Sequence, residues 1–91
     1  MKTIHYSTRF KKDIKRYANR QDVIDVLKGI VECLKRDIPI PSKHKPHRLK
    51  GNYRECWECH IGNDYLLIWV DMTASTVSLE RIGTHHELFG K

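Results

Sequence analysis

The chain has 91 residues, enough for one domain over residues 1–91 but too few for an elaborate buried cleft, so an active site has to be a shallow surface. Seventeen Lys and Arg against eleven Asp and Glu give a net charge of +6, which favours a polyanion such as RNA or DNA as partner. No apolar run is long enough to cross a membrane and no export signal is visible, so we expect a cytoplasmic protein whose three cysteines are reduced.

The first half of the chain is predicted to form one short strand and two helices. Residues 2–6 alternate weakly between apolar and polar, which is typical of a strand. Ser7 or Thr8 can cap a helix that runs to about Asn19, and a second helix follows over about residues 23–34. In both helices the apolar residues recur at spacings of three and four. These two stripes are Phe10, Ile14 and Tyr17, and then Val23, Ile24, Leu27, Ile30, Val31 and Leu34.

The middle of the chain is predicted to be a loop followed by a strand. Residues 37–46 contain three prolines, which cannot continue a helix. From residue 53 to residue 61 the apolar period changes to two, which predicts a strand with Glu58 and His60 on the same face. Gly62-Asn63 is a turn signal at its end.

Two further strands complete the predicted sheet. Residues 65–70 are a continuous apolar run, short enough for a central strand that is buried on both faces. Residues 71–75 turn the chain, residues 76–82 alternate as the last strand, and Gly83 ends it. Residues 85–89 are long enough for a single helical turn. The predicted fold class is therefore α+β, with an N-terminal strand and a helix pair packed on an antiparallel sheet.

Histidines and one acid gather along this predicted sheet. RNA cleavage without a metal needs a base for the 2′-hydroxyl, an acid for the leaving 5′-oxygen and cations for the phosphoryl charge. The candidates for proton transfer are His47, His60, Asp64, His85 and His86, and the candidate cations are Arg48, Lys50 and Arg81. Each has a structural explanation by itself, but their gathering at one end of one sheet points to RNA cleavage.

Of these residues, Arg81 is the hardest to explain as an ordinary solvated surface residue. It shares parity with Val77 and Leu79, so the apolar face of the last strand is predicted to end in a cation. Burying a charge without a partner is costly. The position therefore favours a functional role for this guanidinium.

One competing motif points to different chemistry. Residues 56–60, CWECH, match the C-x-x-C-H attachment site of a c-type haem. In a strand the two cysteines point to opposite faces, and proteins with such haems are exported, so we expect no haem. A structural zinc site needs a second close Cys/His pair. No metal and no other cofactor is therefore expected.

Four segments taken together resemble the YafQ branch of the RelE/ParE superfamily of bacterial type II toxins. They are KPHRLKG at residues 45–51, the strand 53–60 ending in His60, NDYLLI at residues 63–68 and RIGTHHELF at residues 81–89. The resemblance covers essentially the whole chain and implies a RelE-like fold. For this branch it also implies an endoribonuclease, an mRNA interferase that cuts translated mRNA on the ribosome without a metal.

The resemblance implies roles for the candidate residues. His85 is the main acid–base residue, His60 and Asp64 share the opposite proton transfer, His47 positions the RNA, and Arg81 steadies the scissile phosphate. The residues implied in RNA binding are Lys43, Lys45, Arg48, Lys50, Arg54 and Phe89, the last by stacking on or bracing a nucleotide. The implied partners are a cognate antitoxin, acidic or amphipathic, and the ribosome with bound mRNA.

Two other functions remain open from the sequence. A ParE-like toxin that inhibits gyrase would keep the fold but lack the histidine set. A non-catalytic nucleic-acid-binding module would use only the basic clusters, which lie at residues 11–20 and 43–54. Binding by such a module would survive His85→Ala.

Overall fold

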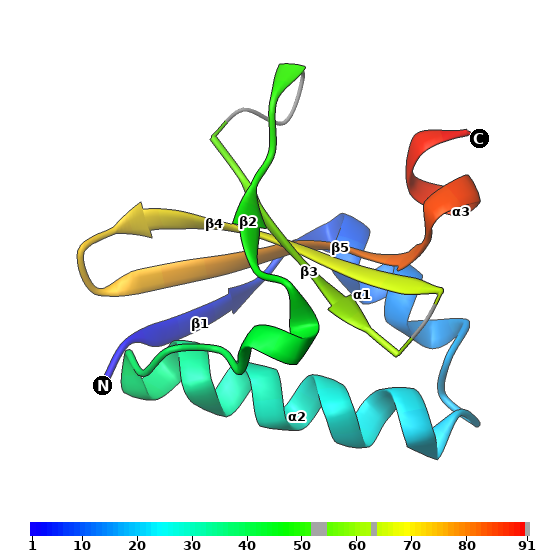
Figure 1. The fold of residues 1–91 in the computed structure, drawn as a ribbon, viewed down its shortest axis with the longest axis horizontal. Coiled ribbons are helices and arrows are strands. Elements are labelled where there is room, and N and C mark those ends of the chain that lie inside the picture. Colours follow the sequence, from blue (N-terminus) through cyan, green and yellow to red (C-terminus); the bar gives the residue numbers. More distant parts are fainter. Residues whose placement is uncertain (52–54, 63, 91) are drawn as a thin grey trace.

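The computed structural model describes residues 1–51, 55–62 and 64–90 (Figure 1). In chain order the elements are β1 (Thr3–Tyr6), α1 (Thr8–Lys15), α2 (Gln21–Arg36), the 3₁₀ turn η1 (Ser42–His44), β2 (His47–Arg48), β3 (Trp57–Ile61), β4 (Tyr65–Thr73), β5 (Thr76–Thr84) and α3 (His85–Phe89). Within the described ranges the strands form one sheet in the order β1-β5-β4-β3-β2. Strands β2 to β5 pair antiparallel and β1 joins β5 in parallel, so the α+β prediction is confirmed.

The two faces of the sheet are covered differently. In Figure 1 the long helix α2 runs along one side of the sheet, and α3 lies on the other side, next to the end of β5. The main core packs between the sheet and the first two helices, and its fully buried members include Ile30, Leu67 and Leu79. A smaller cluster on the opposite face consists of Leu66, Ile68 and Leu88, with Leu49, Cys56 and Phe89 packed against it. This second face is left partly open.

Helix α1 begins where the sequence predicts but ends earlier. Ser7 is the N-cap, and its hydroxyl oxygen accepts a hydrogen bond from the Phe10 amide at 3.0 Å. The helix stops at Lys15 instead of about Asn19, because the next amides bond three residues back instead of four, as in Tyr17 N–H to Ile14 C=O at 3.0 Å. Tyr17 nevertheless stays buried in the core, which explains why its apolar spacing extends the predicted helix.

The last hairpin differs from the prediction at both ends. Strand β4 continues to Thr73, so the predicted turn over residues 71–75 shrinks to the two residues 74 and 75. Gly83 lies inside β5, which runs on to Thr84, and the prediction that Gly83 ends the strand is wrong. A Cβ at this position would lie 3.0 Å from Oε1 of Glu87 and 3.2 Å from Cδ2 of Leu88, so α3 folds back closely onto the strand here and leaves little room for a side chain.

Strand β2 has no counterpart in the sequence prediction. Its two residues pair with β3, His47 opposite Glu58 and Arg48 opposite Trp57. On β3 itself the predicted alternation is confirmed: Cys59 belongs to the main core, whereas Glu58 lies on the opposite face with His47. The predicted strand start at residues 53 and 54 and the turn residue 63 lie outside the described residues. No helix in the described part of the chain has the length and apolar character to cross a membrane.

Candidate active site

The open face of the sheet carries the histidines predicted from the sequence. Strand β2 contributes His47, β3 contributes His60, and α3 contributes His85 and Phe89. A hollow of about 330 Å³ lies between these elements and is lined by Leu49, Glu58, His85 and Phe89. The structure therefore brings residues that are up to 42 positions apart in the sequence, His47 and Phe89, to one shallow surface, as a small domain requires.

His47 is fixed through both ring nitrogens. Nδ1 lies 2.7 Å from the Lys45 carbonyl oxygen, so it has to carry a hydrogen and donate it. Nε2 lies 3.1 Å from Oε1 of Glu58. The imidazole of His47 thus lies within ion-pair distance of a buried carboxylate at the hollow.

Glu58 is the residue that the sequence analysis missed. Its side chain is only 6% exposed, and its second oxygen, Oε2, has no hydrogen-bond partner among the described residues although it is buried. A buried carboxylate with one orphan oxygen beside a hollow is unusual, because such groups are normally satisfied. The signal was present: the strand alternation placed Glu58 on the same face as His60, two residues away, but no role was assigned to it.

His60 lies beside His47 on this face. The two imidazole rings are 6.3 Å apart between centroids and tilted by 40°. The backbone of His60 is held from the other side, since its carbonyl oxygen accepts a hydrogen bond of 3.0 Å from Nδ1 of His44 in η1. The half-buried position of His60 next to His47 is consistent with a shared surface for one substrate group.

His85 is presented by the first residue of α3. Thr84 caps this helix: its hydroxyl oxygen accepts from the Glu87 amide at 3.1 Å, while Oε1 of Glu87 accepts from the Thr84 amide at 2.8 Å. The His85 ring contacts the Phe89 ring one turn later, with 5.1 Å between centroids and 50° between planes. The capped turn thus places an exposed imidazole and a half-buried aromatic ring side by side at the hollow.

Arg81 does not have the position that its parity predicts. The register of β4 and β5 shifts between Ile68 and Trp69, so that Leu79 pairs with Trp69, Arg81 pairs with Ile68, and the intervening Glu80 is bulged out. The alternation is reset there, and Ile82 joins the core in place of Arg81. The prediction that Arg81 shares a face with Val77 and Leu79 is therefore wrong.

The guanidinium of Arg81 is paired instead with Asp13 of α1. Its Nε donates to Oδ2 at 2.6 Å and its Nη2 donates to Oδ1 at 3.2 Å. Asp13 is 3% exposed and also accepts the backbone amide of Ile82 at 3.1 Å. Two donors on one carboxylate give the guanidinium a fixed orientation at the edge of β5.

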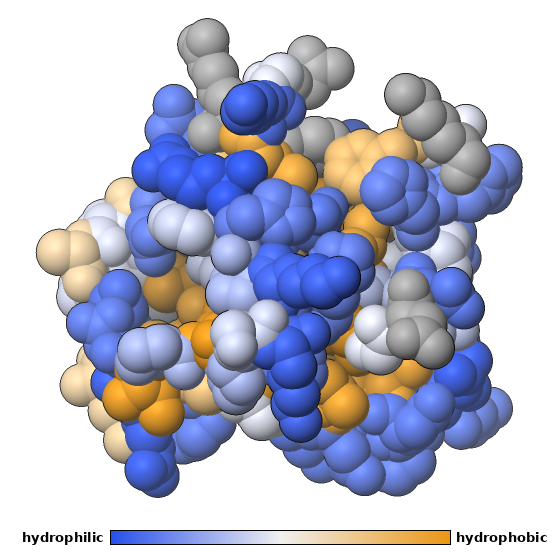
Figure 2. All heavy atoms as spheres, in the orientation of Figure 1, coloured by the Kyte–Doolittle hydropathy of each residue, from blue (hydrophilic) through white to orange (hydrophobic). Residues whose placement is uncertain are grey.

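The other predicted residues are distributed around this surface. Asp64 is exposed at the start of β4 and lines a different depression together with Arg20 and Asp22, so it is not gathered with His47. Arg48 lies over the Trp57 ring, 5.5 Å from its centroid, on the face opposite to His47. Lys43, Lys45 and Lys50 are exposed, and Arg54 lies outside the described residues. Figure 2 shows that hydrophilic residues gather over β2 and its surroundings.

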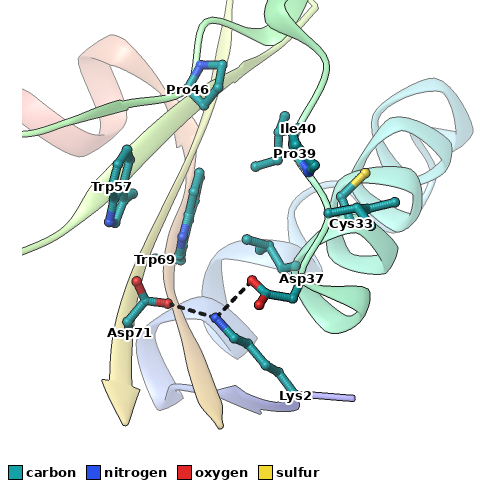
Figure 3. A pocket seen from close by; sticks show the side chains of 11 residues that line it. Lys2, Cys33, Asp37, Pro39, Ile40, Pro46, Trp57, Trp69 and Asp71 are labelled. Atoms are coloured by element: carbon teal, nitrogen blue, oxygen red, sulfur yellow. Dashed lines mark ion pairs between the residues drawn. The ribbon is translucent and has the colours of Figure 1, made fainter. Parts of the chain in front are cut away.

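A second cavity lies on the helix-covered face. Figure 3 shows its two tryptophans, Trp57 and Trp69, which stack within 10° of parallel, and Lys2 at the opposite end. The Lys2 ammonium forms ion pairs with Asp37 at 3.3 Å and Asp71 at 4.0 Å. This cavity of about 290 Å³ contains none of the predicted catalytic residues. Within residues 1–51, 55–62 and 64–90, no three His, Cys, Asp or Glu side chains are grouped so as to hold a metal ion.

Comparisons with known proteins find relatives that match this chain over nearly its whole length. The sequence model of the family described as "Bacterial toxin of type II toxin-antitoxin system, YafQ" matches residues 2–90. The mRNA interferase toxin YafQ of Escherichia coli strain K12 is 33% identical over 88 residues, which cover 96% of this chain and 95% of that protein. The crystal structure of YafQ from E. coli BL21(DE3) is similar with a TM-score of 0.87 and 31% identity, covering 99% of this chain and 100% of that chain. The toxin in the E. coli DinJ–YafQ complex gives a TM-score of 0.84 and 32% identity, again over 99% and 100%.

Proposed function

Because this chain belongs to the YafQ family of bacterial type II toxins, and is therefore an mRNA interferase, we propose that it cuts mRNA on the translating ribosome by acid–base chemistry of its own side chains. The observation that carries the proposal is the gathering of His47, Glu58, His60 and His85 on one open face. The family membership favours a nuclease over a gyrase poison or a passive binding module.

The proposed reaction uses the 2′-hydroxyl of the mRNA as nucleophile. A base removes the proton of this hydroxyl, O2′ attacks the adjacent phosphorus, and the bond from phosphorus to the leaving O5′ breaks. An acid then gives a proton to O5′, so the products are a 2′,3′-cyclic phosphate and a 5′-hydroxyl end. Histidine suits both proton transfers because its pKa ordinarily lies near neutrality. The chain supplies the base, the acid and a cation itself, so the scheme uses no metal.

We assign to these side chains the roles that the family resemblance implies. His85 is exposed at the hollow and is the main acid–base residue. His60 takes the opposite proton transfer, which the resemblance also gives to Asp64 although that carboxylate lines a separate depression. His47 positions the RNA beside Glu58. Arg81, oriented by Asp13, neutralises charge on the phosphoryl group. Phe89 stacks on or braces a nucleotide next to His85.

The exposed basic residues supply the ribosome contacts in this proposal. Lys43, Lys45 and Lys50 surround the strand that carries His47, and Arg54 belongs to the same sequence cluster. Contacts of this kind are electrostatic and weaken with salt. Translation takes place in the cytoplasm, which is therefore where the activity would be exercised. The E. coli relative is found in a DinJ–YafQ complex. A cognate antitoxin, acidic or amphipathic, would in this proposal cover part of the histidine face and silence it.

The test is primer extension on a defined mRNA in a purified translation system. The parent protein is expected to give codon-phased cuts that require ribosomes. These cuts are expected to persist when free divalent metal is chelated, as long as enough metal remains for translation to continue. His85→Ala is expected to abolish these cuts. His86→Ala is the matched control. It removes the neighbouring exposed histidine of α3, which does not line the hollow. A folded His85→Ala variant that cuts like the parent would contradict the assignment of the site.

A further inference from the structure

Glu87 connects α3 to a distant part of the chain. Its Oε1 accepts hydrogen bonds from the Thr84 amide at 2.8 Å and from the hydroxyl of Tyr17. Its Oε2 lies 3.6 Å from Nη1 of Arg16. Tyr17 and Glu87 are 70 positions apart in the sequence. Besides the Thr84 amide of the ordinary capping box, the carboxylate therefore binds a second group of partners, the Tyr17 hydroxyl and the Arg16 guanidinium, at the end of α1.

A helix of five residues needs such support. Isolated helices shorter than about 12 residues are marginal in water, so packing has to define the position of α3. Leu88 supplies one anchor by inserting into the smaller apolar cluster. Phe89 packs against the same cluster, and the tie from Glu87 to α1 adds a polar restraint on rotation about the helix axis. His85 and Phe89 are then held at the hollow together.

The Tyr17 hydroxyl is itself held in place. The side chain is buried, and its ring meets Tyr65 edge-on, with 5.3 Å between centroids and 81° between planes. Tyr65 is the cross-strand partner of Thr84, the cap of α3. Burial, together with Glu87, raises the pKa of Tyr17, so it remains a donor. The Thr84 amide and then the Tyr17 hydroxyl lower the pKa of Glu87, so it remains an acceptor at neutral pH.

The same end of α1 also supports the other predicted catalytic group. Asp13, Arg16 and Tyr17 are spaced by three and four residues and so face one side. Asp13 holds Arg81, and Arg16 Nη1 lies between Oδ1 of Asp13, at 3.7 Å, and Oε2 of Glu87, at 3.6 Å.

We propose that Tyr17 and Glu87 are positioning residues of the nuclease, which hold α3 in the orientation that presents His85 and Phe89 to the mRNA. The inference rests on the proposed function of the His85 face. It assigns these two residues to the turnover step, because they orient α3 without lining the hollow, whereas the ribosome contacts are assigned to the exposed lysines around β2. A displacement of about 1 Å in a reacting group can cost on the order of a hundredfold in rate.

Three variants test this inference in the ribosome cleavage assay, with kcat and KM for the mRNA-loaded ribosome measured separately. Tyr17→Phe removes only the hydroxyl, and Glu87→Ala removes the bonds to both groups of partners. Both are expected to lower kcat by about tenfold or more at an unchanged KM. Glu87→Gln keeps a carbonyl oxygen for Thr84 and Tyr17, so it is expected to stay within about threefold of the parent. Tyr6→Phe is the matched control, since Tyr6 packs on Phe10 at the other end of α1.

Hydrogen exchange and stability separate positioning from general destabilisation. In Tyr17→Phe the amides of Glu87 and Gly90, which bond within α3, are expected to exchange faster while those of β4 do not. The inference is overturned if folded Tyr17→Phe and Glu87→Ala have the kcat of the parent. It is also overturned if their kcat becomes equal to the parent's once it is corrected for the folded fraction. If the parent itself makes no ribosome-dependent cuts, the proposed function fails instead, so the two failures are distinguishable.

Discussion

Asp13→Ala is expected to be one of the most destabilising single substitutions in this chain. It leaves the guanidinium of Arg81, which is only 17% exposed, without the carboxylate that accepts two of its hydrogen bonds. It also leaves the buried amide of Ile82 without its acceptor. Removing one partner of a buried ion pair typically costs about 3–5 kcal/mol, a large part of the roughly 5–15 kcal/mol that stabilises a small domain. Asp13→Asn retains an acceptor for the Ile82 amide, and so it is expected to cost about 1–3 kcal/mol.

Urea unfolding followed by circular dichroism measures these differences through the transition midpoint at constant slope. In thermal melts each kcal/mol corresponds to roughly 4–8 °C for a domain of this size. Asp22→Ala is the control, because it removes an exposed carboxylate that also pairs with an arginine, and it is expected to leave the midpoint where it is. The double variant Asp13→Ala with Arg81→Met should recover part of the loss, since it replaces the guanidinium that has lost this carboxylate with an apolar side chain. A free energy of unfolding for Asp13→Ala that lies within about 0.5 kcal/mol of the parent's value would refute the reasoning.

Three further predictions concern the buried Cys59 thiol, the Glu87 carboxylate and the exposed lysines around β2. Burial raises the pKa of the Cys59 thiol to about 12, so iodoacetamide at pH 8 should leave Cys59 unmodified in the folded protein and label it in urea; rapid native labelling would contradict its burial. Bonds from the Thr84 amide and then from Tyr17 depress the pKa of Glu87, so its stabilising contribution is present at neutral pH and is lost as the pH falls below 4.5 through the lower value of the folded state. The unfolding free energy of Glu87→Gln should accordingly change less over that acidic range, and an identical pH profile would exclude this linkage. Replacing Lys43, Lys45 and Lys50 with Gln should weaken ribosome binding and lower the slope of log affinity against log salt by about one unit for each lost phosphate contact, whereas a parental slope would place the contacts elsewhere.

The sequence predicts the elements whose signals are local. The stripe of Val23, Leu27 and Ile30 predicts α2, and the apolar run from residue 65 predicts the central strand β4. Strand β2 leaves no such signal, because a two-residue strand is defined by its pairing with β3 and not by its own composition. The true end of α1 was missed for a related reason, since Tyr17 keeps the helical spacing of buried residues after the helical hydrogen bonds have stopped.

The site shows the same division between local and distant causes. The shared face of Glu58 and His60 follows from strand alternation and was predicted, although Glu58 was given no function. The position of Arg81 was predicted wrongly, because one bulged residue resets the alternation and nothing in the sequence of β5 marks it. The prediction that Gly83 ends the strand fails because the reason for this glycine is the close approach of Glu87 and Leu88, which lie on the following helix. Such features depend on contacts across the fold, which periodicity does not contain.

The edge of β5 explains why folding and activity depend on the same residues. β1 pairs with β5 only as far as Leu79, so the part of β5 that carries Arg81 and leads to His85 continues past its parallel neighbour. An exposed strand edge invites association with other chains and has to be covered. The start and the end of α1 cover it, because the Ser7 hydroxyl donates to the Glu80 carbonyl at 3.0 Å and Asp13 accepts from the Ile82 amide. Since the carboxylate that protects the edge also orients Arg81, substitutions there should lower stability and turnover together, and only rates normalised to the folded fraction can separate the two effects.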